Sequence, residues 1–402
     1  MSSSPETIAL TKQRLSTRWT VLSIYTLNLG IGNMLAYQFA SVLIPIQDKY
    51  GVSELLASTL VLVSSVFYIL VSIPAGHLVD QKGYIYSTRI GIIIQIIFSW
   101  IRVATESFWI LLLCEIGIAI AQPFILNSIS KLIFCWFQED EAAQATGFGT
   151  VGIFIGIGVA LITTPFLYES IGIRFAMLFY ACITTAIGAL FLFNRQLQKE
   201  TSTKESLPEQ FSWSLLRNRH LLLLYFLSFI GLGVFNGVIT FLETILSYHD
   251  LSSTTSGVVG GLIILAGIIG TLVISIISDM VKARKPLLIL CTVAAFTFLV
   301  PLCISYNYPM AAITGMIFGF SLLPAFSLLL EMCAEMAGDD LAGSATSILM
   351  LSGNAGGVVV ILAIGGAGDL TSIITGLMII TGAGLIGTLF TKETYMNSTL
   401  NV

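Results

Sequence analysis

Apolar runs long enough to cross a lipid bilayer recur along this sequence, and they constrain its fold more than any other feature. A helix needs about 20 residues to cross the hydrocarbon core of a bilayer. Runs of roughly this length or longer, separated by Gly, Pro or charged residues, lie at 18–46, 54–77, 86–104, 107–136, 142–167, 173–194, 220–247, 255–278, 286–305, 308–336, 343–366 and 371–391. They lack the strict polar and apolar alternation of barrel strands, so they predict twelve transmembrane α-helices.

The charge content excludes a soluble fold. Only 10% of the residues are charged and 56% are hydrophobic, whereas soluble domains carry about 25% charged residues. The net charge of -4 and the absence of a strongly basic arm argue against nucleic-acid binding. The six cysteines lie within or beside apolar runs without a CxxC pair, and the three histidines have no ligand spacing. We therefore expect neither a metal site nor a cofactor.

The distribution of Lys and Arg predicts the orientation. If both termini are cytoplasmic, fifteen Lys and Arg residues fall on the inner side and three on the outer side, which agrees with the positive-inside rule. The longest polar segment divides the runs six and six. The expected organisation is a cytoplasmic tail 1–17, a six-helix half 18–194, a cytoplasmic linker 195–219, a second half 220–391 and a cytoplasmic tail 392–402.

An internal repeat supports this division. Asp80 and Asp279 occupy matching places in the loops after the second and the eighth apolar run. The Gly30-x-Gly32 pair of the first run recurs at a similar offset in the seventh. Two pseudo-symmetric halves of this kind place a substrate site between them, near the middle of the bilayer.

The loop after the second run resembles the signature of the major facilitator superfamily. Residues 76–83 read Gly-x-x-x-Asp-x-x-Gly and are followed by basic residues. The resemblance covers nearly the whole chain and implies the major facilitator fold, with transport by alternating access. In that family the loop Asp caps a helix and meets basic residues, which latches the outward-facing state. By position these roles fall to Asp80, Lys82, Gly83 and Arg89.

The second copy of this loop departs from the pattern. Ser275 replaces the first Gly and Ala283 lies near the place of the second. Its charged residues, Asp279 and Arg284, are the expected counterparts of the first latch.

Four segments resemble the feline leukaemia virus subgroup C receptor family, whose members are linked to haem, choline and ethanolamine transport. They are 18–53, 121–137, 233–243 and 328–343. The resemblance places Gln122 on a substrate-contacting Gln. It also shows two departures, because Ala36 stands where choline-transporting members have Trp, and Asn236 where they have Tyr. Recognition of quaternary ammonium groups relies on aromatic faces, so these changes weaken the case for choline.

Polar residues inside the apolar runs are the candidates for substrate binding, since a polar group in hydrocarbon is costly unless it meets a cavity or a partner. The alternative for each is a hydrogen bond that holds two helices together. Those of the seventh run form one helical stripe at i, i+4 and i+7. The predicted substrate-binding residues are Asn33, Tyr37, Gln38, Gln122, Asn236, Thr240, Glu243 and Asn354.

Charged residues inside the runs suggest a gate. Glu331 and Glu335 lie four apart in the cytoplasmic half of the tenth run, and Lys131 lies at a similar depth in the fourth. A pair between Glu331 and Lys131, or between Glu335 and a basic residue, would form an inner gate. Alternatively, Glu331 or Glu243 would carry a proton. Arg102 and Glu115, near the predicted outer surface, are expected to form a structural ion pair.

Glycines are concentrated in the fifth and eleventh runs, which are repeat partners. Gly152-x-x-x-Gly156 has the spacing of closely packed membrane helices. We expect these runs to provide sliding contacts between the halves, or simple tight packing.

Together these patterns predict a secondary transporter for a small polar or cationic organic solute, of the choline, ethanolamine or haem-related kind by resemblance. The alternatives are a proton-coupled carrier of another metabolite, with protons as the coupling ion, and a membrane receptor or sensor on a transporter fold. The sequence carries no catalytic constellation, so an enzyme is not expected. The expected partners are the solute and the lipid bilayer, and the protein is predicted to be a functional monomer, spanning the cell membrane many times.

Overall fold

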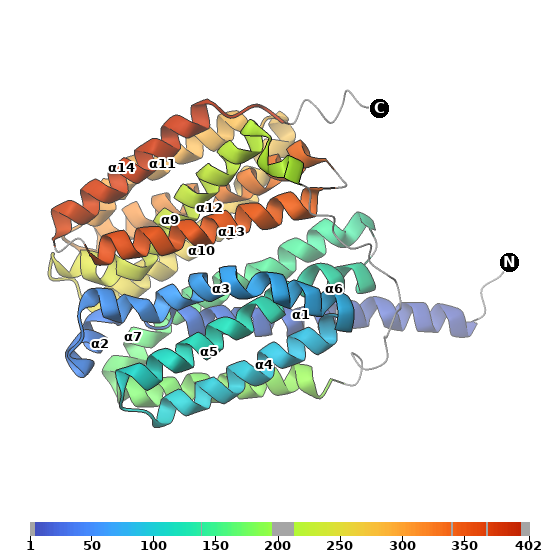
Figure 1. Cartoon of the computed structure of the whole chain (residues 1–402), viewed down its shortest axis with the longest axis horizontal. Coiled ribbons are helices and arrows are strands. Elements are labelled where there is room, and N and C mark those ends of the chain that lie inside the picture. The colour runs from blue at the N-terminus through green and yellow to red at the C-terminus, as the bar shows by residue number, and fades with distance from the viewer. Residues whose placement is uncertain (1–4, 138, 195–212, 339–340, 367–368, 395–402) are drawn as a thin grey trace. The chain divides into compact units, whose positions relative to one another are not determined.

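The computed structural model describes residues 5–137, 139–194, 213–338, 341–366 and 369–394 (Figure 1). Over these residues the chain is helical throughout, without a strand. Most of the predicted linker, 195–212, and the ends of both predicted tails lie outside the described residues. The part of the N-terminal tail that is described, from Pro5 onward, already belongs to the first helix.

The helices follow the apolar runs closely. The helices before the linker are α1 (Pro5–Tyr37), α2 (Leu43–Tyr50), α3 (Glu54–Lys82), α4 (Tyr84–Ile101), α5 (Phe108–Leu126), α6 (Ile129–Trp136) and α7 (Glu139–Leu192), with a short 3-10 helix η1 (Arg102–Ala104) between α4 and α5. The short 3-10 helix η2 (Trp213–Leu216) lies in the last part of the predicted linker. It is followed by α9 (Arg219–Ser247), α10 (Ser253–Val281), α11 (Lys285–Cys303), α12 (Tyr308–Ala337), α13 (Ala342–Gly365) and α14 (Leu370–Leu389).

Two predicted helices are interrupted. The run 18–46 is not one helix, because α1 ends at Tyr37 and α2 begins at Leu43. Pro45 explains the restart, since proline lacks an N–H and is tolerated in the first turn of a helix but not in its interior. The run 107–136 breaks between α5 and α6. The runs 142–167 and 173–194 form α7, whose helical geometry fails at Gly172, with φ 80° and ψ 162°.

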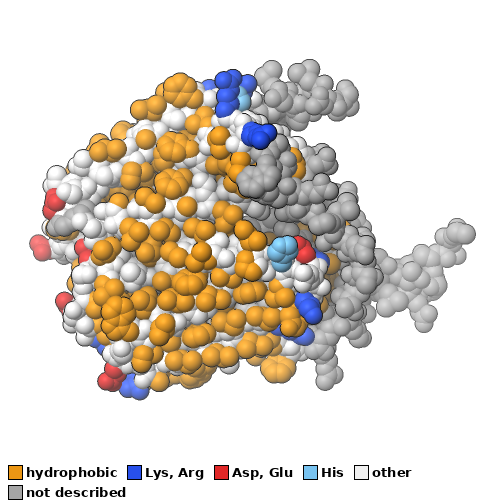
Figure 2. Space-filling view, in the orientation of Figure 1, with side chains coloured by type: hydrophobic (Ala, Val, Ile, Leu, Met, Phe, Trp, Pro, Cys, Tyr) orange, Lys and Arg blue, Asp and Glu red, His pale blue; other side chains and the backbone are white. Residues whose placement is uncertain are grey.

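Ten helices of the described residues are long and apolar enough to cross a membrane. The structure therefore supports an all-helical, multi-pass membrane protein. One of the ten covers 49 residues and includes the break at Gly172, so it spans two of the predicted runs. Figure 2 shows hydrophobic side chains over most of the visible face of the described residues, with charged side chains near its edges.

The chain divides into two compact units. Unit 1 consists of residues 1–36, 70–156 and 173–207, and unit 2 of residues 37–69, 157–172 and 208–402. The division does not follow the linker, because unit 2 contains the whole second half together with two segments of the first half. Those segments contain two of the three predicted outer loops of the first half.

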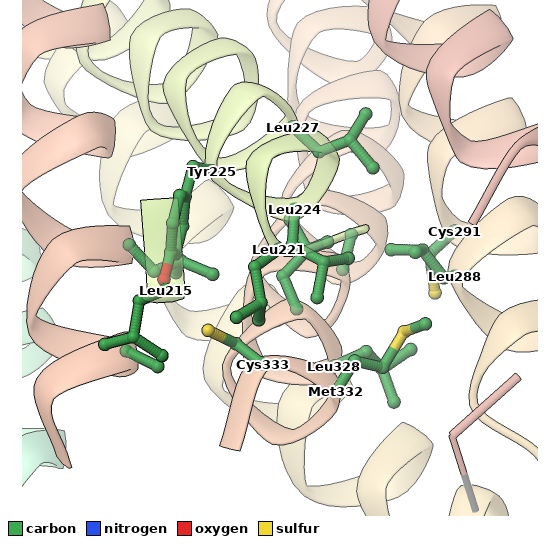
Figure 3. Close-up of a cluster of buried hydrophobic side chains, with 14 of the residues drawn as sticks. Leu215, Leu221, Leu224, Tyr225, Leu227, Leu288, Cys291, Leu328, Met332 and Cys333 are labelled. Atoms are coloured by element: carbon green, nitrogen blue, oxygen red, sulfur yellow. The ribbon is translucent and has the colours of Figure 1, made fainter. Parts of the chain in front are cut away.

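Each unit has its own apolar core. In unit 1 the core is formed by residues of α1, α4, α5 and α6, including Leu22, Tyr25, Ile92 and Ile125. In unit 2, side chains of α9, α11 and α12 meet around Leu224, Cys291 and Met332 (Figure 3). Five of the six cysteines are buried or half-buried, and Cys182 is exposed.

Glycines allow the closest helix approaches inside each unit. In unit 1, a side chain at Gly30 would lie 2.9 Å from the carbonyl oxygen of Gly152, and a side chain at Gly156 would collide with Gly30. In unit 2, a side chain at Gly233 would lie 3.0 Å from the carbonyl oxygen of Gly356. Gly152 and Gly156 of α7 and Gly356 of α13 therefore pack tightly on α1 and α9 within their own half of the chain. Other glycines of α7 and α13 do contact the other half within unit 2, because Gly158 faces Ile264 of α10 and Gly365 faces Leu55 of α3.

Candidate functional site

The end of α1 meets the middle of α9 in unit 2. The Tyr37 hydroxyl donates a hydrogen bond of 2.5 Å to Oδ1 of Asn236. Gly357 of α13 makes room for this amide, since a side chain there would lie 2.6 Å from Asn236 Nδ2. Asn236 is only 4% exposed. Two predicted substrate-binding residues, 199 positions apart, are thus brought into direct contact.

Glu243 lies two turns further along α9 and is 1% exposed. Its carboxylate accepts a hydrogen bond of 3.1 Å from the backbone N–H of Ile44, at the start of α2, and another from the Ser253 hydroxyl at the start of α10. The N-terminus of a helix favours a carboxylate because its N–H groups have no partner inside the helix. Glu243 therefore fastens α2 and α10 to α9.

The other predicted substrate-binding residues of unit 2 occupy different surroundings. Thr240 is completely buried on α9 between Asn236 and Glu243, and Gln38 is buried in the turn that follows α1. Asn354 is half-buried and its Nδ2 donates to the carbonyl of Met350 in its own helix, at 3.0 Å. The polar stripe of α9 is thus shared with the end of α1, whereas Asn354 bonds within α13.

In unit 1, Gln122 of α5 crosses to α1. Its Nε2 donates to the carbonyl oxygen of Gly32 at 3.0 Å. Asn33 bonds to the carbonyl of Leu29 in its own helix, also at 3.0 Å. Both side chains are half-buried. They remain candidates for contact with a solute.

The loop around Asp80 is open. Asp80 belongs to the last turn of α3 and its side chain is exposed, as is that of Lys82. The residue that precedes α4 is Gly83, and no side chain caps that helix. Asp80 therefore does not cap α4, and the capping role that the family resemblance implied for it stays a prediction. Lys131 does reach this loop, because its ammonium donates to the carbonyls of Val79 and Asp80 at 3.1 and 3.0 Å.

The matching loop of unit 2 holds a charge cluster, which we call the Arg284 cluster (Asp279, Arg284, Glu331, Glu335). The guanidinium of Arg284 lies 2.6 Å from Glu331, 3.0 Å from Asp279 and 3.2 Å from Glu335. Burial opposes the charge of Arg284, but the three carboxylates outweigh it and raise its pKa above the ordinary value. The predicted gating acids thus have a basic partner on α11, and the predicted pairing of Glu331 with Lys131 stays a prediction.

The C-terminal segment completes this cluster, which the sequence did not indicate. The Glu393 carboxylate accepts the backbone N–H groups of Arg284 and Lys285 at 2.9 and 3.0 Å, which caps α11. The Thr394 hydroxyl donates to Glu335. These contacts join residues more than 50 positions apart. The sequence signal for them is weak and consists of one acidic residue, Glu393, in a short polar segment.

Arg102 and Glu115 form the ion pair expected from the sequence, at 2.7 Å. Both side chains are almost completely buried. Because a buried charge without a partner is very unfavourable, this pair fixes η1 against α5 and has a structural role.

Long apolar helices with buried polar contacts are typical of a multi-pass membrane protein. The chain belongs to the Major Facilitator Superfamily, whose sequence profile matches residues 26–361. Proteins of this family that resemble the chain are membrane transporters and not enzymes.

Individual relatives cover most of the chain. An uncharacterized MFS-type transporter of Caenorhabditis elegans is 25% identical over 93% of this chain and 68% of its own length. The choline/ethanolamine transporter FLVCR1 of Mus musculus is 24% identical over 83% of this chain and 66% of its own length. The narrower resemblance found in the sequence is thereby confirmed. A bacterial homologue of the human lysosomal transporter Spinster, solved in an inward-facing and unoccupied conformation, has the same fold, with a TM-score of 0.71, 16% identity and coverage of 92% and 95% of the two chains.

Proposed function

We propose that this protein is a secondary transporter that moves a small polar or cationic organic solute, of the choline and ethanolamine kind, by alternating access. It does so through twelve transmembrane helices in two pseudo-symmetric halves, with both termini in the cytoplasm. Relatives named as choline/ethanolamine transporters support the substrate class. The charge bias of the loops supports the orientation.

One observation carries the mechanism. Unit 2 unites the second half of the chain with two segments of the first half, which contain two of its three predicted outer loops. The Tyr37–Asn236 and Glu243–Ile44 hydrogen bonds hold these segments together. A transporter that works by alternating access needs its halves joined at one end at a time. These contacts form the joint at the predicted outer end, and they must break for that end to open.

The substrate and the mechanism are tested together by uptake into proteoliposomes. Radiolabelled choline and ethanolamine should enter vesicles that contain the protein and should equilibrate down their own gradients. Gln122→Ala should raise the KM while the protein still folds. Asn236→Ala should change the rate of uptake as well, because it also removes the bond to Tyr37. Wild-type uptake in both variants would contradict the proposal.

Proton coupling is the second candidate, and the buried carboxylate of Glu243 favours it over Glu331. Among the described residues, the hydrogen-bond donors to Glu243 are neutral, a backbone N–H and a hydroxyl, whereas Glu331 pairs with Arg284. A carboxylate without a cationic partner in a membrane interior can exchange a proton during transport. If an imposed proton gradient drives the solute uphill in the wild type but not in Glu243→Gln, the carrier is proton-coupled. If the gradient has no effect, the protein is a uniporter.

A further inference from the structure

Gln95 is a buried polar residue for which the structure shows no partner. It lies on α4 in unit 1, is 2% exposed, and its Nε2 makes no hydrogen bond within the described chain. An amide that loses its hydrogen bonds to water costs several kcal/mol in an apolar medium. Buried polar groups without a protein partner therefore require a reason, such as a ligand or a water molecule.

Two other buried polar residues of α4 do have partners for their side chains. The Ser87 hydroxyl donates to the carbonyl of Phe124 at 2.8 Å, and the Ser99 hydroxyl to that of Ile96 at 2.8 Å. A glutamine that served only to hold helices together would have a comparable bond. Gln95 has none, so a role in helix association does not explain it.

The amide of Gln95 lies against α1 at Gly32. A side chain at that position would come within 2.6 Å of Gln95 Nε2, so the amide fills the space that the glycine leaves. On the same turn, Gln122 donates to the carbonyl of Gly32. Two amides, one from α4 and one from α5, thus converge on one turn of α1, and we call this group the Gly32 niche (Gly32, Gln95, Gln122).

The niche borders accessible space. Gln122 is half-buried, and Asn33, the next residue on α1, is half-buried as well. A solute that reaches Gln122 would therefore lie beside Gln95. The unused donor of Gln95 requires an acceptor, and an amide N–H binds the oxygen of a hydroxyl or carbonyl group well.

We propose that Gln95 contacts the transported solute, and that its Nε2–H donates a hydrogen bond to a hydroxyl oxygen of that solute in the Gly32 niche. This inference rests on the proposed function, since it takes the solute to be a small amino alcohol. Gly32 is essential to it because any side chain there would displace the amide.

Pairs of solutes that differ only in the hydroxyl group test the inference. Choline is compared with ethyltrimethylammonium, and ethanolamine with ethylamine, in uptake by the full-length protein in proteoliposomes. In the wild type the hydroxyl compound should have a KM about tenfold lower, the size of one good hydrogen bond. In Gln95→Met this ratio should fall close to one, while the KM of each deoxy compound stays within about twofold.

Thr88→Val is the matched control. Thr88 lies seven residues before Gln95 on the same face of α4, is fully buried, and its hydroxyl also lacks a partner within the described chain. It is two turns away from the Gly32 niche, so this variant should keep the wild-type ratio. An unchanged ratio in Gln95→Met, or an equal loss in Thr88→Val, would overturn the inference.

Thermal unfolding of the solute-free protein tests the inference without reference to the substrate. Replacing an unsatisfied amide by an apolar side chain of similar shape is neutral or stabilising. The Tm of Gln95→Met should therefore equal or exceed that of the wild type, and a Tm several degrees lower would show that Gln95 is a structural residue. If the wild type takes up neither choline nor ethanolamine, the proposed substrate class fails. The Tm values of the wild type and Gln95→Met still decide whether Gln95 is a structural residue or is available to bind a ligand.

Discussion

The loop after α3 and the loop after α10 occupy matching places in the two halves, yet the structure uses their charges differently. The first has the complete Gly-x-x-x-Asp-x-x-Gly pattern, and its Asp80 and Lys82 are exposed. The second has lost both glycines, and its Arg284 is surrounded by three carboxylates. The copy that looks weaker in sequence has the stronger set of contacts.

The difference indicates that the charges of the second loop stabilise the fold, whereas those of the first loop are available for a change of conformation. Charges closed within one unit stabilise that unit in every conformation, whereas exposed charges contribute little to stability and stay available for new partners. The Arg284 cluster also receives the chain end through Glu393, and the first loop has no such addition among the described residues. Substitutions in the two loops should therefore affect different measurements.

Arg284→Met should have the largest effect on stability. It leaves Asp279, Glu331 and Glu335 side by side without their common cation, and removing one partner of a buried pair costs about 3–5 kcal/mol. The acids are partly exposed, so we expect a cost at the low end and a Tm lower by several degrees. Lys82→Met in the first loop should leave the Tm unchanged. Equal losses in the two variants would remove the contrast between the loops.

The pH dependence of this cluster has a defined sign. Because the carboxylates raise the pKa of Arg284 above its ordinary value, its contribution to stability is complete below the pKa that it has in the unfolded chain. That contribution is lost only as the pH rises through the still higher folded pKa. Between pH 6 and 9 the stability difference between wild type and Arg284→Met should therefore not change on account of the arginine.

Gly83→Ala, in the first loop, should cause the next largest loss of stability. Gly83 has φ 84° and ψ 162°, a region that is open essentially to glycine alone and costs about 1–3 kcal/mol for other residues. The space around it is empty, so the cost is purely conformational. Gly76→Ala, equally unhindered but inside α3, should be neutral or slightly stabilising. If both variants lose the same stability, strain at Gly83 is not the cause.

Glu393→Ala should cost about 1 kcal/mol, the usual loss for a helix N-terminal cap. The variant leaves the N–H groups of Arg284 and Lys285 without their acceptor. Thermal unfolding measures the loss, and Asp80→Ala is the matched carboxylate in the first loop. Asp80→Ala should keep the wild-type Tm. It should slow the uptake of solute if Asp80 forms its latch only in the outward-facing conformation. A lower Tm for Asp80→Ala would place a stabilising contact where the structure shows an exposed side chain.

The two loops also show what the sequence could and could not predict. The helices were predictable because an apolar run is a local signal, and so was the pairing of Glu335 with a basic residue on the same side of the membrane. The break between α1 and α2 was missed, although Pro45 marks it. Gln95 was missed although a polar residue inside the apolar run 86–104 is a local signal. Glu393 was missed for a physical reason, because its role depends on contacts with a segment far away in the chain, and a single sequence gives no sign of which distant residues meet.

Lys282→Gly should have the smallest effect, and an effect of opposite sign. Lys282 ends α10 with φ 55° and ψ 43°, a left-handed conformation that glycine adopts without the strain of a side chain. The first loop already has a glycine, Gly83, at its position of positive φ, and this substitution would place a glycine at the corresponding position of the second loop. We expect a gain of about 0.5 kcal/mol and a Tm about one or two degrees higher. The neighbouring Ala283, which has no positive φ, is the control, because Ala283→Gly should lower the Tm by making the unfolded chain more flexible. If Lys282→Gly lowers the Tm instead, the lysine side chain makes a stabilising contact that outweighs its backbone strain. The second loop would then be stabilised by Lys282 as well as by the Arg284 cluster.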